Sequence, residues 1–180
     1  AYNTDWQDRN LTKSVTTGQG DSGDTDVIFL TGVNQKHSGV ELETNYAVND
    51  MLDLMFVASF GNWKFDGDAN GNYQETEYNS EGQAIGYTTT EYAYALDGLY
   101  VGDMPQTSYV LGVTLKPIKD LRIQAIHKMY DKNYSDWSPD AREFDGTNDD
   151  ADRAQVWEAP SYNRLDLHMS YKLPKVKDLD

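Results

Sequence analysis

The sequence predicts an all-β protein, an antiparallel up-and-down meander of the kind found in transmembrane β-barrels. Three observations predict it. Apolar and polar residues alternate with a period of two along six segments, and helical periodicity is nearly absent. Short and long connections alternate between these segments. Several tyrosines and tryptophans, among them Tyr46, Trp63 and Tyr130, lie near the segment ends, as they do in the aromatic girdles of membrane barrels.

The clearest strand is the segment LDLHMSYKL near the end of the chain. Leu165 and Leu167 fall on one face, and Asp166 and His168 fall on the other. The remaining segments repeat this pattern: the opening residues from Tyr2, then 39–48, 52–63, 108–116 and 121–130. His127 departs from the pattern because its position places it on the apolar face. A β-bulge, a contact with another chain or a misplaced strand would each explain it.

The connections differ in length in a regular way. The short ones are 48–51, 117–120 and 174–178, and the long, hydrophilic ones run from about 16 to 25, 66 to 105 and 138 to 162. In an antiparallel meander this alternation places all short turns at one end and all long loops at the other. Membrane barrels have this asymmetry, whereas soluble β-sandwiches have mostly short loops and strands of about 5–6 residues. A soluble β-sandwich that binds calcium and glycans stays open as the alternative.

The composition restricts the classes of partner. The net charge is −15 at pH 7, and binding to duplex nucleic acid requires clustered Lys and Arg, so we expect no nucleic-acid partner. No window approaches the roughly 18 apolar residues of a transmembrane helix. No secretory signal pattern is present either, and we expect a mature protein or a piece of one.

The stretch DGDANGNYQETE matches the calcium-loop pattern D-x-[DN]-x-[DN]-G-x5-E at every fixed position. No amphipathic helices flank it, which excludes a paired-helix EF-hand, but oxygen ligands on a tightly turned backbone suffice for calcium. A solvated acidic turn is the alternative, and a second acidic run, 145–152, is expected to be a solvated loop. The expected Ca²⁺ ligands in this extracellular loop are Asp66, Asp68, Asn70, Asn72 and Glu77.

Aromatic rings in or near the long loops are the candidate ligand contacts, because ring faces suit both sugars and the aryl groups of chelates. An arginine beside them would meet an anionic chelate. Packing of the rings within the loops is the alternative. The candidates are Trp63, Tyr130, Tyr134, Trp137, Arg142 and Trp157, with Tyr162 and Arg153 beside them.

Catalysis is not expected. His37, His127 and His168 lie on different segments without the spacing of zinc ligands, and no G-x-S-x-G motif is present. A small outer-membrane hydrolase barrel is a rival interpretation. It would require chemistry on a suitable substrate and a complete barrel of at least about eight strands.

Four stretches, taken together, resemble the later barrel strands of TonB-dependent outer-membrane receptors. They are VNQKHSGVELETNYAV, LDLMFVASFGNWKFDG, VGDMPQTSYVLGVTLKPIKDLRIQ and PSYNRLDLHMSYKL. The similarity extends over nearly the whole chain and rests on the order and spacing of these stretches rather than on a single motif.

The resemblance implies a barrel of about 22 strands, closed by an N-terminal plug, in the outer membrane of a Gram-negative bacterium. Such a receptor imports a scarce nutrient, such as a ferric siderophore or a glycan, with energy delivered by TonB. Six strands cannot close a barrel, and an open sheet leaves unpaired edges in lipid. We therefore expect residues 1–180 to be a partial barrel domain. Its expected partners are the remaining strands and plug, the TonB complex, a small-molecule ligand and outer-membrane lipid.

Overall fold

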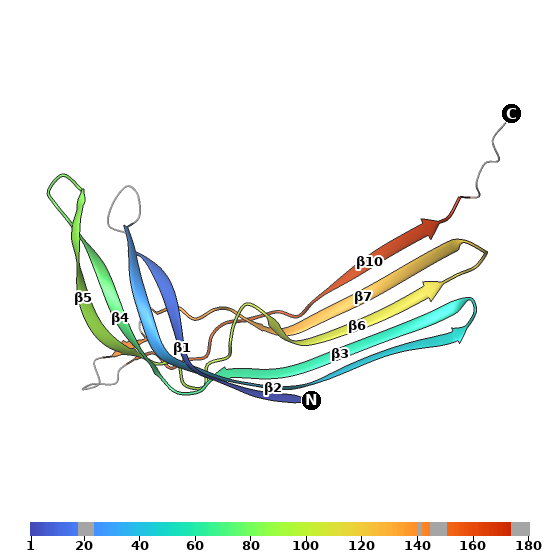
Figure 1. Cartoon of the computed structure of the whole chain (residues 1–180), viewed down its shortest axis with the longest axis horizontal. Coiled ribbons are helices and arrows are strands. Elements are labelled where there is room, and N and C mark those ends of the chain that lie inside the picture. The colour runs from blue at the N-terminus through green and yellow to red at the C-terminus, as the bar shows by residue number, and fades with distance from the viewer. Residues whose placement is uncertain (18–23, 140–141, 145–150, 174–180) are drawn as a thin grey trace.

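The computed structural model describes residues 1–17, 24–139, 142–144 and 151–173. These residues form one ten-stranded antiparallel sheet that curls along its length (Figure 1). Within these ranges, no helix has the length and apolar character needed to cross a membrane. The predicted all-β meander is confirmed.

All six predicted strands are present and pair with their neighbours in chain order. They follow each other across the sheet as β1, β2, β3, β6, β7 and β10. Their bounds are β1 Tyr2–Thr17, β2 Asp24–Asn49, β3 Leu52–Phe65, β6 Pro105–Leu115, β7 Leu121–Tyr134 and β10 Tyr162–Tyr171. β2 is longer than predicted, at 26 residues, because it continues past the end of β3.

The short turns lie together, as the alternation of connection lengths predicts. The β2–β3 turn and the β6–β7 turn meet at one end of the sheet (Figure 1), which we name the turn end; the opposite end is the loop end. The Lys116 backbone N–H donates to the Met51 carbonyl oxygen at 2.8 Å and joins the two turns. The predicted turn at 174–178 lies outside the described residues.

The two faces of the sheet differ in the way that the alternation predicts. Leu167 and Met169 on β10 are 72 % and 76 % exposed, whereas Thr114, on the other face of β6, is 4 % exposed. We name these the apolar face and the polar face. The large side chains of the apolar face are exposed on β10, and no second sheet covers them in the described part of the chain. The β-sandwich alternative was therefore wrong.

The predicted loop from 66 to 105 was wrong in part, because it contains a hairpin. β4 Ala69–Tyr78 and β5 Ala84–Tyr94 pair with each other, and β4 continues the line of β3 along β2. Two short strands, β8 Glu143–Phe144 and β9 Glu158–Ala159, lie within the predicted loop 138–162 and pair with β5 and β7. In Figure 1 the hairpin rises at an angle from the rest of the sheet.

Two β-bulges change the side-chain alternation near the loop end. The first adds a residue to β1 between Trp6 and Arg9, where Asp8 has φ 52°. The second adds a residue to β2, where Gly32 has φ 69°, a conformation that glycine adopts at little cost. The first bulge brings Trp6 and Arg9 to the same face, and the second turns Leu30 toward that face as well.

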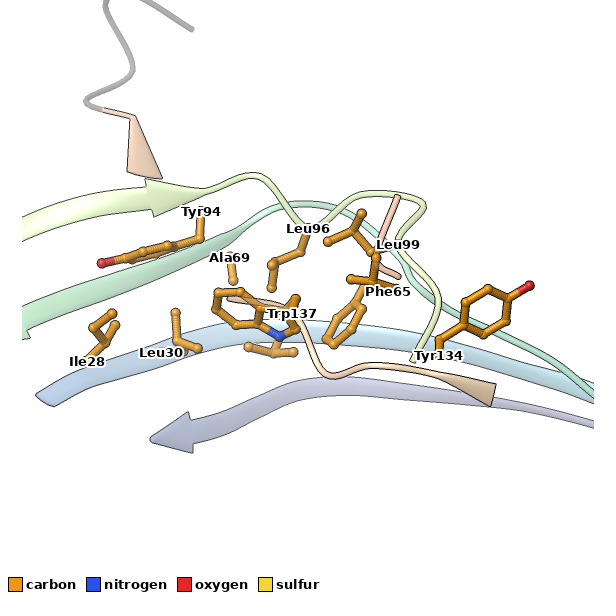
Figure 2. Close-up of a cluster of buried hydrophobic side chains, with 11 residues drawn as sticks. Ile28, Leu30, Phe65, Ala69, Tyr94, Leu96, Leu99, Tyr134 and Trp137 are labelled. Atoms are coloured by element: carbon orange, nitrogen blue, oxygen red, sulfur yellow. The ribbon is translucent and has the colours of Figure 1, made fainter. Parts of the chain in front are cut away.

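The loop end has a hydrophobic core, shown in Figure 2. It lies between β1 and β2 on one side and β4, β5 and the segments after β5 and β7 on the other. Its buried members are Ile28, Leu30, Val33, Phe65, Ala69, Tyr94, Leu96, Leu99, Tyr134, Trp137 and Val156. The long connections therefore pack against the strands through buried apolar side chains.

His127 is exposed on the apolar face, as its position in the sequence indicates. It pairs with Leu111 on β6 and with Leu165 on β10, and neither ladder shifts its register. The explanations by a bulge and by a misplaced strand were therefore wrong.

Candidate ligand-contact site

Three aromatic rings form a row across β1, β2 and β3 on the polar face near the loop end. The register places them side by side, because Thr4 and Trp63 both pair with His37. The ring centroids of His37 and Trp63 are 5.5 Å apart with an interplanar angle of 14°, and those of Trp6 and His37 are 6.0 Å apart. We name Trp6, His37 and Trp63 the aromatic row. Such a surface suits stacking by a planar or cyclic ligand.

A buried glutamine holds the row together. The Arg9 Nη1 donates to Gln35 Oε1 at 2.9 Å, and His37 Nε2 lies 3.2 Å from the same oxygen. The Arg9 guanidinium carbon also lies 4.9 Å from the Trp6 ring centroid, a cation–π distance. A guanidinium has five N–H donors, so this arrangement leaves donors for an anionic group on a ligand that stacks on the row.

Two glycines give the rings their space. The Trp63 Nε1–H donates to Tyr2 Oη at 2.8 Å. A Cβ on Gly39 would lie 2.5 Å from Tyr2 Oη, and one on Gly61 would lie 2.9 Å from the Trp63 ring. The side chains of Tyr2 and Trp63 therefore lie over the glycine backbone of β2 and β3, which fixes the orientation of the Trp63 ring.

Of the predicted ligand residues, Trp63 belongs to the aromatic row. Tyr130 lies elsewhere on β7 and stacks on Tyr162, with ring centroids 5.0 Å apart. Trp157 is 66 % exposed, next to β9. Ligand binding by these residues stays a prediction, but the structure brings neither Tyr130 nor Trp157 to the aromatic row.

Tyr134, Trp137 and Arg142 are buried, which favours the packing role given as the alternative. Tyr134 stacks on Tyr100 with ring centroids 4.1 Å apart, and Trp137 is 3 % exposed in the loop-end core. Arg142 donates from both terminal nitrogens, at 2.8 Å each, to the backbone carbonyls of residues 152 and 154. In this structure the loops cover these three side chains, and ligand contact by them stays a prediction.

The loop conformation on which the calcium prediction rests was also wrong. Asn70, Asn72 and Glu77 lie in β4, where seven residues of extended chain separate the first from the last by roughly 23 Å. Calcium ligands must all lie about 2.3–2.6 Å from one ion, so these residues cannot surround it in this conformation. Among the described residues, no group of three or more His, Asp or Glu could hold a metal ion. Calcium binding by this chain stays an untested prediction.

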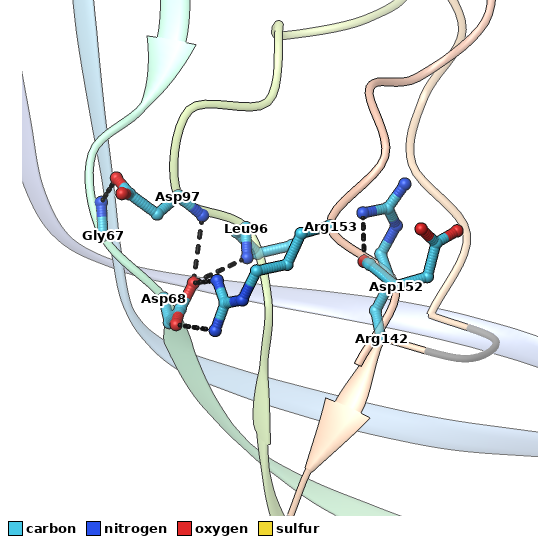
Figure 3. Close-up of polar contacts among 7 residues, drawn as sticks. All are labelled: Gly67, Asp68, Leu96, Asp97, Arg142, Asp152 and Arg153. Carbon is cyan, nitrogen blue, oxygen red and sulfur yellow. Dashed lines mark hydrogen bonds and ion pairs between the residues drawn. The ribbon is translucent and has the colours of Figure 1, made fainter. Parts of the chain in front are cut away.

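The two aspartates of that motif have other partners, and Asp68 is the better anchored (Figure 3). Asp66 pairs with Lys36 at 2.8 Å. Asp68 accepts from both terminal nitrogens of Arg153, at 3.1 and 2.9 Å, and from the backbone N–H groups of Leu96 and Asp97 at 3.0 Å each. These contacts tie the segment after β5 and the segment before β9 to the β3–β4 junction.

The charge of Asp68 follows from the same contacts. Burial raises the pKa of its carboxyl, but the hydrogen bonds from Arg153 and from the two backbone N–H groups outweigh burial and hold this pKa below its usual range. The carboxylate is therefore charged at neutral pH, and the anchor persists there.

Sequence reasoning missed Trp6, Arg9 and His37. Strand alternation predicted the face of Trp6, but the bulge at Asp8 that turns Arg9 to that face has no signal in the apolar pattern. The register between Trp63 and His37 could not be obtained by extending the short 48–51 turn, because an irregularity between Ala47 and Asn49 shifts the β2–β3 pairing by one residue.

The chain matches the family model described as "TonB dependent receptor-like, beta-barrel" over residues 1–180. No curated protein and no solved structure matches the chain.

Proposed function

The chain belongs to the TonB-dependent receptor β-barrel family, and on this basis we propose that it forms the ligand-facing wall of a receptor that imports a scarce nutrient. Proteins of this family are outer-membrane receptors and transporters rather than enzymes. The proposed setting is the outer membrane of a Gram-negative bacterium, with the apolar face against lipid. The proposed partners are the remaining strands and plug of the receptor and the TonB energy-coupling complex.

The aromatic row is the observation that supports a ligand-binding role for this part of the wall. Its rings lie on the polar face, which in a closed barrel lines the interior. They lie near the loop end, where a ligand arriving from outside would enter. Trp6 is exposed although it is large and apolar, and an exposed tryptophan beside a guanidinium is a common contact in binding sites.

We propose a ferric siderophore or a similar small chelate as the ligand, and a glycan as the second candidate. Both stack on aromatic faces. The Arg9 guanidinium, held beside Trp6, favours the chelate because it supplies positive charge to an anionic ligand. A neutral glycan would use the rings without needing this charge.

Truncating the aromatic row should weaken ligand binding without preventing barrel assembly. We expect Trp6→Ala and Trp63→Ala in the intact receptor to lower affinity roughly 5- to 30-fold each, the loss typical of an aromatic contact in a binding site. Arg9→Met should lower affinity for an anionic chelate and leave affinity for a neutral glycan unchanged. The measurement is equilibrium binding of candidate ligands to the purified receptor in detergent.

The matched control is Phe60→Leu, which alters an exposed ring of β3 on the opposite face of the sheet. It should bind ligand as the unaltered receptor does. If the Trp6, Trp63 and Phe60 variants bind the ligand with equal affinity, the aromatic row does not contact the ligand. Uptake that continues in cells lacking TonB would contradict the proposed energy source.

A further inference from the structure

A partly open cavity of about 260 Å³ lies at the loop end, apart from the aromatic row. Three tyrosines line it, two from β5 and one from β4, together with the carboxylate-bearing Glu143 of β8. The described lining residues are Val15, Ile28, Tyr73, Tyr92, Tyr94, Pro139 and Glu143. This volume is slightly below the roughly 300–1,000 Å³ of drug-sized pockets, so it suits a headgroup rather than a whole siderophore.

The walls of the cavity are aromatic faces. The rings of Tyr73 and Tyr92 are 6.5 Å apart and nearly perpendicular, with an interplanar angle of 74°. The Tyr73 hydroxyl donates to the buried Asp26 at 2.6 Å, which directs that hydroxyl away from ligand binding and fixes the ring. Tyr94 is fully buried and packs against Trp137, 6.2 Å away, so the floor of the cavity is fixed as well.

The charge of the cavity is negative. Pairing between β5 and β8 places Glu143 directly opposite Tyr94. Burial, together with the smaller effect of the nearby Glu143 carboxylate, raises the pKa of Tyr94 to about 12. Glu143 is exposed and forms no ion pair with any residue that the structure describes. None of the described lining residues is cationic.

Lys13, a candidate counter-ion on β1, is already engaged. Its ammonium pairs with Asp136 and donates to the Trp137 carbonyl oxygen at 3.1 Å. It also lies 4.6 Å from the Trp137 ring centroid. The carboxylate of Glu143 is therefore not neutralised from this side.

We propose that this cavity binds an organic ammonium group, held by cation–π contacts with Tyr73 and Tyr92 and by the charge of Glu143. Aromatic faces around a carboxylate are the chemistry that recognises alkylammonium and quaternary ammonium cations. An anion would be repelled by Glu143, and a neutral sugar would find the Tyr73 hydroxyl already used. The site is separate from the aromatic row, and its occupation does not depend on transport.

The test uses choline and its neutral isostere 3,3-dimethyl-1-butanol, titrated calorimetrically against the intact receptor in detergent. Choline should bind and the neutral alcohol should bind at least about tenfold more weakly, because only the cation gains cation–π and ionic contacts. Equal affinity for the two, or no choline binding at millimolar concentrations, would overturn the proposal.

Single-residue variants test whether the lining residues of the cavity, rather than the overall stability of the protein, determine choline binding. Tyr92→Leu should weaken choline binding about three- to thirtyfold, the range for losing one cation–π contact, and Glu143→Gln should weaken it while keeping the shape. Tyr87→Leu, on the opposite face of β5 and 64 % exposed, is the matched control and should bind choline normally. An equal loss in the Tyr87 and Tyr92 variants would overturn the proposal. Nutrient binding at the aromatic row should be unchanged in all three, so the two proposals fail independently.

Discussion

Replacing Trp137 with alanine should release the segment after β7 from the sheet. The six long strands, β1, β2, β3, β6, β7 and β10, should stay assembled. Trp137 is 3 % exposed, packs on Tyr94 and carries the Lys13 ammonium over its ring. Truncating a buried tryptophan costs about 3–5 kcal/mol. Hydrogen-exchange protection of amides that hold this segment should fall by roughly two to three orders of magnitude. One such amide is that of Ser135, which donates to the Trp157 carbonyl oxygen at 2.8 Å.

Trp157→Ala is the control for this experiment, because it removes the same side chain from the same segment at an exposed position. Its protection pattern should stay within the change of about 0.5 kcal/mol expected at a surface site. Wild-type protection of Ser135 in the Trp137 variant would show that the loop-end core does not hold this segment.

Placing an arginine at Leu167 should oppose membrane assembly. Leu167 lies in the middle of β10, pairs with Ala125 of β7 and is 72 % exposed on the apolar face. An arginine that faces lipid near the bilayer midplane costs roughly 2–4 kcal/mol. We expect the Leu167→Arg receptor to unfold from lipid vesicles at lower denaturant concentration and to reach the outer membrane in smaller amounts.

The adjacent residue provides the control. His168→Arg places the same charge one position along β10 but on the polar face, where it meets water and the polar side chains around Gln124. Its stability in vesicles should be close to that of the unaltered receptor. Equal destabilisation by both arginines would mean that the two faces do not differ in environment.

The six long strands and their faces could be predicted because the environment imposes a strict alternation on them. Leu165 and Leu167 alternate with Asp166 and His168. Only an extended β-strand places the two leucines on one face and the two polar residues on the other. Short turns join β2 to β3 and β6 to β7, so these neighbour relations follow from the chain itself.

The β4–β5 hairpin could not be predicted in this way. Its sequence, ANGNYQETEY and AIGYTTTEYAY, is polar on both faces for much of its length, because it extends past the apolar band. The tyrosines, the threonines and Ile85 are the residues that favour strand there. Gly71, the glycine at the fixed position of the calcium-loop pattern, lies within β4. A Cβ at that position would come within 2.6 Å of the Tyr94 ring, so the glycine makes room for packing.

The sequence also could not show which aromatic ligand candidates are buried and which are exposed. Tyrosine and tryptophan near a strand end serve equally well as interface rings, ligand contacts or core. The sequence shows that Trp137 and Trp157 belong to the same connection, but only the packing of that connection buries the first and exposes the second. The bulges at Asp8 and Gly32, which bring Arg9 to the face of Trp6 and turn Leu30 toward the core, are likewise set by local backbone conformation.

The central claim is that the apolar face meets hydrocarbon and the polar face meets water. The chain has no cysteine, so single cysteines at positions 165 to 170 can each carry a spin label in the receptor reconstituted in lipid vesicles. Labels at 165, 167 and 169 should be relaxed by oxygen dissolved in the bilayer, and labels at 166, 168 and 170 by a water-soluble nickel chelate. Absence of this two-residue period, or a period with the opposite phase, would contradict the account.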